Sequence, residues 1–177
     1  MQYILVLLVV AVILFLVFRS KPKMMDDLGN HWHHFFAGLK FSTNEFYALV
    51  EENIKAQAMP DVEVSRVDFS EGGLFSDKRE YLRVERKDDM FDICAAPFGA
   101  GFFVSYWLGT PKRFFKNMVK SIPGVRAVSG EATYYKEDAA CMFRGLVVSC
   151  VTTAIDEITT SKGIRGLTEN ERTAMNK

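Results

Sequence analysis

The chain begins with a long, uninterrupted apolar run. Residues 3–18 are all aliphatic or aromatic, and the first charged side chain is that of Arg19. A helix from Met1 to Ser20 would be about 30 Å long, which matches the hydrocarbon core of a bilayer. A lone segment in lipid must satisfy its own backbone groups, and a helix does so. Residues 1–23 are therefore predicted to be a single-pass transmembrane anchor with a basic flank.

Two other interpretations of this run were weighed. A cleaved signal peptide would carry a basic residue before the run and small residues at its end. Only Met1 and Gln2 precede the run, and residues 19–22 read RSKP, which is no cleavage site. A buried core helix would need a polar face, which this run lacks. A signal anchor that stays in the membrane accounts for the pattern best.

The charges around the run predict its orientation. Arg19, Lys21 and Lys23 follow the run, and no basic side chain precedes it. Lys and Arg near a span stay on the cytoplasmic side. We therefore predict a protein of the cell (inner) membrane with its carboxyl-terminal domain in the cytoplasm. An odd number of cysteines in apolar contexts agrees with reduced thiols there. These cysteines are Cys94, Cys141 and Cys150.

Residues 24–41 mix aromatic side chains with the three histidines of the chain. Aromatic residues are enriched at the surface of a membrane, so these residues are predicted to be a juxtamembrane interfacial segment with Trp32 at the surface. On a helix, His31 and His34 would share one face and could hold a metal. No CxxC or HExxH accompanies them, and we predict no metal or cofactor.

The period of the apolar positions then changes twice. Ser42 to about Ala58 has the helical period, and Ser42 and Glu45 have the spacing of a capping box. From residue 62 the period becomes two, which is typical of strands. Four strands are predicted, at 62–69, 81–86, 90–96 and 102–108. The strand at 81–86 alternates apolar and charged residues, so it should be half exposed. The four would form an antiparallel meander with helices on one face.

The apolar stretch 93–108 has an alternative explanation as a membrane-inserted segment. Pro97 and two glycines favour strands joined by a turn.

The helical period returns at residue 111. Segment 111–122 starts with Pro111 and carries four cations and no acid. It would either pack on the sheet or lie on the anionic inner leaflet. The predicted membrane-surface contacts are Arg19, Lys21, Lys23, Trp32, Lys112, Arg113, Phe115, Lys116 and Lys120.

The carboxyl-terminal region contains two further predicted helices. A long helix covers about residues 136–161, and Gly163 ends it in a Schellman-type stop. Its predicted apolar stripe consists of Ala139, Phe143, Leu146, Val147, Cys150, Val151, Ala154 and Ile158. Thr168 and Glu171 form a second capping box, which opens a short terminal helix. Residues 125–135 leave room for one more short strand. Residues 42–177 are thus predicted to be one α+β domain.

Charge and motifs limit the function. Lys and Arg total 22 and Asp and Glu total 22, so the net charge is zero, which argues against nucleic acid as a partner. Enzyme signatures such as the P-loop and GxSxG do not occur. We predict a non-enzymatic scaffold, adaptor or assembly component at the inner leaflet, with the lipid bilayer and other proteins as partners. The alternative is a membrane-tethered enzyme whose site combines Asp92, Cys94 and Glu131.

Overall fold

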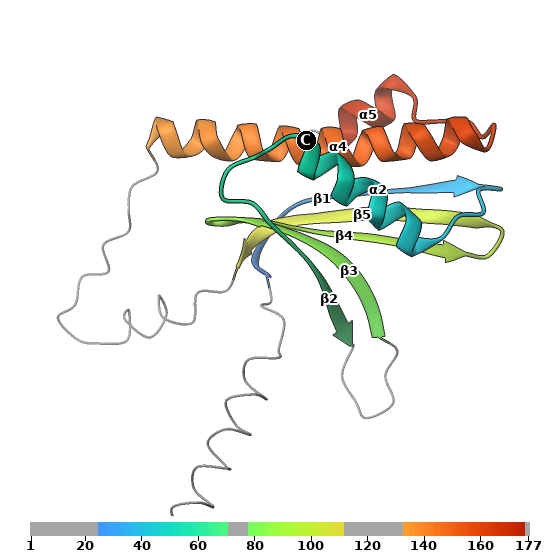
Figure 1. The fold of residues 1–177 in the computed structure, drawn as a ribbon, viewed down its shortest axis with the longest axis horizontal. Coiled ribbons are helices and arrows are strands. Elements are labelled where there is room, and N and C mark those ends of the chain that lie inside the picture. The colour runs from blue at the N-terminus through green and yellow to red at the C-terminus, as the bar shows by residue number, and fades with distance from the viewer. Residues whose placement is uncertain (1–24, 71–77, 112–132, 176–177) are drawn as a thin grey trace, which may run out of the picture.

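The computed structural model describes residues 25–70, 78–111 and 133–175 (Figure 1). Its elements are β1 (Met25–Ala37), α2 (Thr43–Ala56), β2 (Glu63–Ser70), β3 (Lys78–Arg86), β4 (Asp89–Phe98), β5 (Gly101–Pro111), α4 (Tyr134–Ser161) and α5 (Glu169–Met175). The strands form one sheet in the order β1-β5-β4-β3-β2, and every neighbouring pair is antiparallel. The predicted α+β class is confirmed. The predicted anchor at 1–23 and most of the basic segment 111–122 lie outside the described residues.

The four-stranded meander predicted from the alternation is present as β2 to β5. Residues 93–108, for which a membrane-inserted segment was the alternative, lie in β4 and β5 and in the turn between them. Strand β5 is longer than predicted and reaches Pro111, because it pairs with a fifth strand along most of its length.

That fifth strand, β1, was not predicted. The segment expected to lie at the membrane surface pairs instead with β5, and Trp32 stacks on Tyr106 with the ring centres 5.7 Å apart. Trp32 is only 6% exposed and belongs to the hydrophobic core of the domain. The physical reason is that aromatic residues pack well on a pleated, half-buried surface. The alternation of Trp32, His34 and Phe36 with exposed residues is a strand pattern.

The strand also separates the two histidines that might have shared a metal. His31 stacks on Trp107 at 3.7 Å, whereas His34 lies against Phe36 at 4.5 Å. Residues three apart on a strand point to opposite faces of the sheet. Among the described residues no group of His, Cys, Asp and Glu side chains could hold a metal ion.

Helices α2 and α4 cover one face of the sheet (Figure 1). Their inner residues meet strand residues of the same face in one core, which includes Phe46, Val50, Leu82, Ile93, Phe102, Val104, Phe143, Val147, Val151 and Ile155. Ser42 is the N-cap of α2, but its side chain makes no capping hydrogen bond, so the capping box predicted there does not form.

The carboxyl-terminal stop and cap are present as predicted. Gly163 has a positive φ of 62°, and the Ile164 N–H bonds to the Thr159 carbonyl at 2.9 Å, as in a Schellman motif. The Thr168 N–H donates to Glu171 at 2.6 Å, which completes the second capping box. The Tyr106 hydroxyl donates to the carbonyl of Met175, so α5 is held over the edge of the core.

One helix side chain sits between two strands of the sheet. The pairing of β3 with β4 stops at Leu82 and Ile93. Beyond that point the Tyr47 hydroxyl donates to the Glu80 carbonyl at 2.9 Å and accepts from the Ala95 N–H at 3.1 Å. Tyr47 thus bridges two backbone groups that would otherwise lack partners. From this fork β2 and β3 curve away from the helices (Figure 1).

Candidate functional site

The structure brings two of the suggested catalytic residues together. Asp92 and Cys94 lie two residues apart on β4, on the sheet face that α2 and α4 do not cover. Two nitrogens of Arg83, Nε and Nη2, donate to the two carboxylate oxygens of Asp92, both at 2.7 Å. Burial raises the pKa of Asp92, while these bonds act to lower it. Asp92 is therefore a structural partner of Arg83.

Cys94 does not have the environment of a nucleophile. It is 1% exposed, and burial raises the pKa of its thiol. A reactive cysteine needs the opposite, a lowered pKa and partial exposure. Glu131, the third residue of that suggestion, lies outside the described residues. Asp92 and Cys94, the two residues that the structure does bring together, therefore have the environments of buried structural residues.

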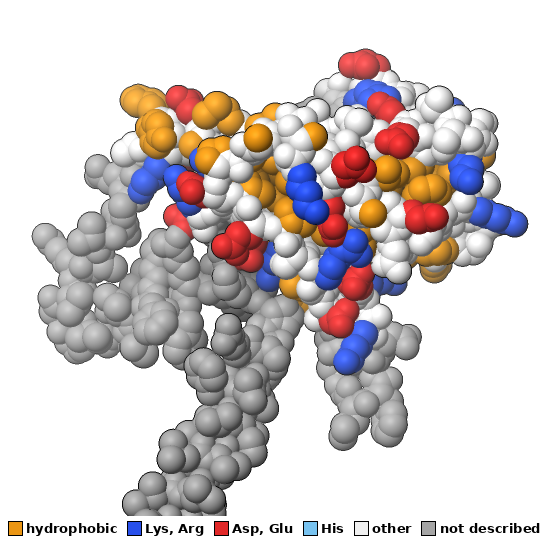
Figure 2. Space-filling model, in the orientation of Figure 1, with side chains coloured by type: hydrophobic (Ala, Val, Ile, Leu, Met, Phe, Trp, Pro, Cys, Tyr) orange, Lys and Arg blue, Asp and Glu red, His pale blue; other side chains and the backbone are white. Residues whose placement is uncertain are grey.

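The most unusual surface of the described domain is the outward side of α4. We define the α4 outer surface as the exposed residues Tyr135, Met142, Gly145, Leu146, Ser149 and Thr153. Their spacing of three, four and seven places them along one side of the helix, opposite the buried stripe. Tyr135 is 75% exposed, Met142 63% and Leu146 36%. Hydrophobic side chains gather over the amino-terminal end of α4 in Figure 2.

Apart from Asp138, which is exposed and has the same helical spacing, this surface lacks the charges that an outward helix face normally carries. Between residues 139 and 155 the only charged residue is Arg144. Arg144 turns toward the sheet and donates to Asp89 at 3.0 Å. A helix packed on a core by one side usually has charged or polar residues on the other. The apolar character of α4 therefore exceeds what the core of the domain requires.

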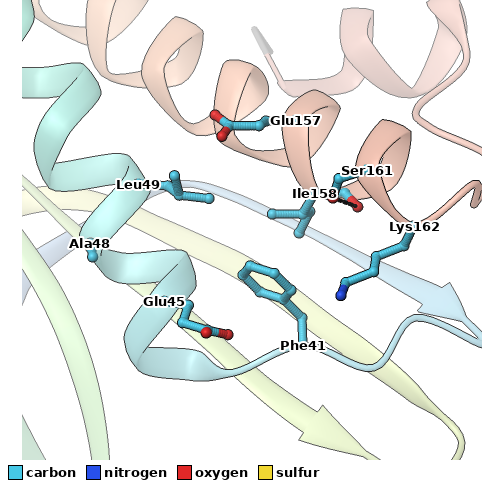
Figure 3. Close-up of a pocket in the computed structure, with 8 residues that line it drawn as sticks. All are labelled: Phe41, Glu45, Ala48, Leu49, Glu157, Ile158, Ser161 and Lys162. Carbon is cyan, nitrogen blue, oxygen red and sulfur yellow. Dashed lines mark hydrogen bonds between the residues drawn. The ribbon is translucent and has the colours of Figure 1, made fainter.

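A groove adjoins the carboxyl-terminal end of this surface. We call it the α2–α4 groove; it has a volume of about 400 Å³, and Figure 3 shows its lining. The lining residues are Phe41, Glu45, Ala48, Leu49, Glu157, Ile158, Ser161 and Lys162. Thr153 is one helical turn before Glu157, and both are exposed, so the groove and the α4 outer surface meet there.

The buried stripe predicted for this helix included Leu146, but Leu146 is 36% exposed and lies on the outer side of α4. The signal for the outer surface was present, because one charge in seventeen residues is too few for a half-exposed helix. The groove had no such signal, since strands β2 to β5 lie between α2 and α4 in the chain.

Trp32 is the one member of the predicted membrane-surface set that falls within the described residues. Arg19, Lys21, Lys23, Lys112, Arg113, Phe115, Lys116 and Lys120 all lie outside the described residues. Within the described part, α4 is the single helix long and apolar enough to cross a membrane by length and composition. These two properties are shared by core helices, and the inner side of α4 packs in the core.

Comparison with protein-family models and with curated proteins finds no match to this chain.

Proposed function

We propose that the chain is a single-pass membrane protein whose α+β domain, strand β1 included, is a non-enzymatic adaptor or assembly component at the inner leaflet. In this proposal the domain binds a protein partner through the α4 outer surface, while the apolar run at 3–18 holds it at the membrane. The carboxyl-terminal domain faces the cytoplasm, because the basic residues follow the run.

The observation that carries the proposal is the exposed side of α4, which has no outward charge between residues 139 and 155 although the opposite side packs in the core. Interface cores are poor in charged residues and rich in aromatic residues and Met. Tyr135 and Met142 have these properties and are more than half exposed in the single chain. Met142 and Leu146 are one helical turn apart, so their exposed side chains lie together, and clustered apolar side chains on a folded domain mark binding sites.

A protein partner explains this surface better than lipid does. Helices that lie on an anionic membrane carry Lys and Arg along their polar face. The α4 outer surface is instead flanked by the carboxylates of Asp138 and Glu157. Contact with an anionic leaflet would bring like charges together.

Two measurements on the full chain test the proposal. The chain should stay with membranes through a carbonate wash, and removal of residues 1–23 should release it, because an inserted helix is held far more strongly than a surface contact. After mild solubilisation the native chain should migrate as part of a larger complex.

The variant Leu146→Lys should shift the chain to the size of the isolated protein, because it places a charge in the apolar surface. Glu63→Lys on the exposed side of β2 is the matched control and should leave the complex unchanged. A native chain that migrates alone, or a complex that survives Leu146→Lys, would contradict the adaptor function. Recovery in the soluble fraction would contradict the anchor.

A further inference from the structure

We infer that the α2–α4 groove receives a basic amphipathic helix of the protein partner. This inference rests on the proposed function and specifies the chemistry of the partner. It is drawn from the lining of the groove, from the charges at its rim and from its position beside the α4 outer surface.

The floor of the groove is apolar and is built from three separate elements of the chain. Phe41 precedes α2, Leu49 lies on α2 and Ile158 lies on α4 (Figure 3). Phe41 and Leu49 are only partly buried, although both pack against the core. An apolar side chain of a partner could therefore bury them further. This is how an amphipathic helix binds between two helices, with anchors spaced by three and four residues.

The rim of the groove has an excess of negative charge. Glu45 and Glu157 contribute carboxylates from opposite sides, and Lys162 contributes one ammonium group. None of these three forms an ion pair with another described residue, unlike Arg66, Arg83 and Asp89 on the sheet. Glu52, a further exposed acid, lies two turns after Glu45 on α2. Unpaired carboxylates around an apolar floor favour a partner with Lys or Arg beside its apolar anchors.

The occupant is taken to be a helix because of the surface that continues from the groove. Along α4 the exposed positions run from Glu157 through Thr153 and Ser149 to Leu146. These positions span eleven residues, a length of about 16 Å. An elongated ligand of helical diameter could contact the groove and the α4 outer surface together. The small residues Ser149 and Gly145 would allow its backbone to approach α4 closely.

The inference can be tested with a designed peptide. The probe is an 18-residue helix with leucines at i, i+3, i+4 and i+7 spacing and lysines elsewhere; its matched control has glutamate in place of every lysine. Binding is measured to the full chain in nanodiscs of phosphatidylcholine, with empty nanodiscs as the reference for lipid binding. The lysine peptide should bind the protein about tenfold more tightly than the glutamate peptide. A rise in NaCl concentration should reduce this difference.

Two variants locate the binding site. Glu45→Gln combined with Glu157→Gln should weaken binding of the lysine peptide about fivefold, since exposed charge pairs are individually weak. Ala48→Arg should weaken it more, because this exposed residue lies in the groove and the new side chain is bulky and cationic. Glu63→Gln is the control and should bind as the native chain does. Near-ultraviolet circular dichroism verifies that each variant is folded.

Equal binding of the two peptides, or binding unchanged by both groove variants, would overturn the inference. So would peptide binding that empty nanodiscs reproduce in full. None of these results would alter the size of the native complex or its response to Leu146→Lys. Failure of the groove inference is therefore distinguishable from failure of the adaptor function.

Discussion

At the scale of the residue, the sheet face away from the helices depends on one buried ion pair. Arg83 is 2% exposed and Asp92 5% exposed, and each is the direct neighbour of the other across β3 and β4. The sequence pattern at 81–86 predicted a half-exposed strand, with Arg83 among its solvent-facing charges. The residue pattern of one strand does not show which residue will lie opposite on the next strand. Here Asp92 lies opposite Arg83, and its carboxylate makes burial of the Arg83 charge possible.

Removal of one member of this pair should destabilise the domain strongly. Asp92→Asn should lower the free energy of unfolding by about 3 kcal/mol, because Arg83 stays buried without its counter-charge. The joint replacement Arg83→Met with Asp92→Leu should cost much less. The measurement is the urea midpoint of the full chain in detergent micelles. Arg165→Met, which removes an exposed pair with Glu171, is the control and should cost less than about 1 kcal/mol. Equal losses for Asp92→Asn and Arg165→Met would contradict this assignment.

At the scale of the element, the three described helices and strands β2 to β5 were predictable, and the edge strand β1 was not. Strands β2 to β5 have the alternation expected of strands, and α4 has a buried stripe with the helical period. β1 was interpreted as interfacial because its aromatic and histidine residues follow the apolar run. Aromatic residues are common both at membrane surfaces and in β-sheets. Only the pairing with β5 distinguishes a strand from an interfacial segment here. The same ambiguity holds for caps: Ser42 and Thr168 head similar sequences, yet only the Thr168 side chain caps its helix.

Two glycines should respond to alanine in opposite ways. A Cβ at Gly145 on the α4 outer surface meets nothing within 4 Å, whereas one at Gly101 would collide with the Phe35 ring and the Phe36 carbonyl. Gly145→Ala should stabilise the isolated chain by about 0.5–1 kcal/mol, the usual preference of a helix for alanine. Gly101→Ala should destabilise it by about 1–3 kcal/mol through overpacking. Thermal unfolding of the two variants checks this, and stabilisation by Gly101→Ala would show that the β1–β5 contact is misplaced.

The capping box of α5 predicts a dependence on pH. Hydrogen bonds from the Thr168 N–H and hydroxyl, helped by Arg165, lower the pKa of Glu171 from 4.5 to about 2. A carboxyl group whose pKa is lower in the folded state stabilises the fold above its usual pKa, and this stabilisation is lost as pH falls from about 4.5 to about 2. Glu171→Gln should therefore remove part of the fall in melting temperature over this range. Glu169→Gln on the same helix should retain it; identical pH profiles for all three chains would contradict the prediction.

At the scale of the whole molecule, the proposed function combines a membrane anchor at 1–23 with an interaction surface on α4. The sequence predicts the anchor directly from an apolar run and its basic flank. The low charge of residues 139–155 indicates that α4 has apolar residues beyond its buried side, but the sequence does not show which residues are exposed, because that depends on which side of the helix packs on the sheet. The groove is not predictable from the sequence either, because it forms only when the strands between α2 and α4 place the two helices side by side.

The most direct test of the central claim is site-specific photo-crosslinking in intact membranes. A photoreactive phenylalanine derivative is placed at Met142 or Leu146, and in a control chain at the exposed Asn170 of α5. The account predicts a discrete protein adduct from positions 142 and 146 and none from position 170. Absence of a protein adduct at 142 and 146, or the same adducts from all three positions, would contradict the assignment of the α4 outer surface as the binding site.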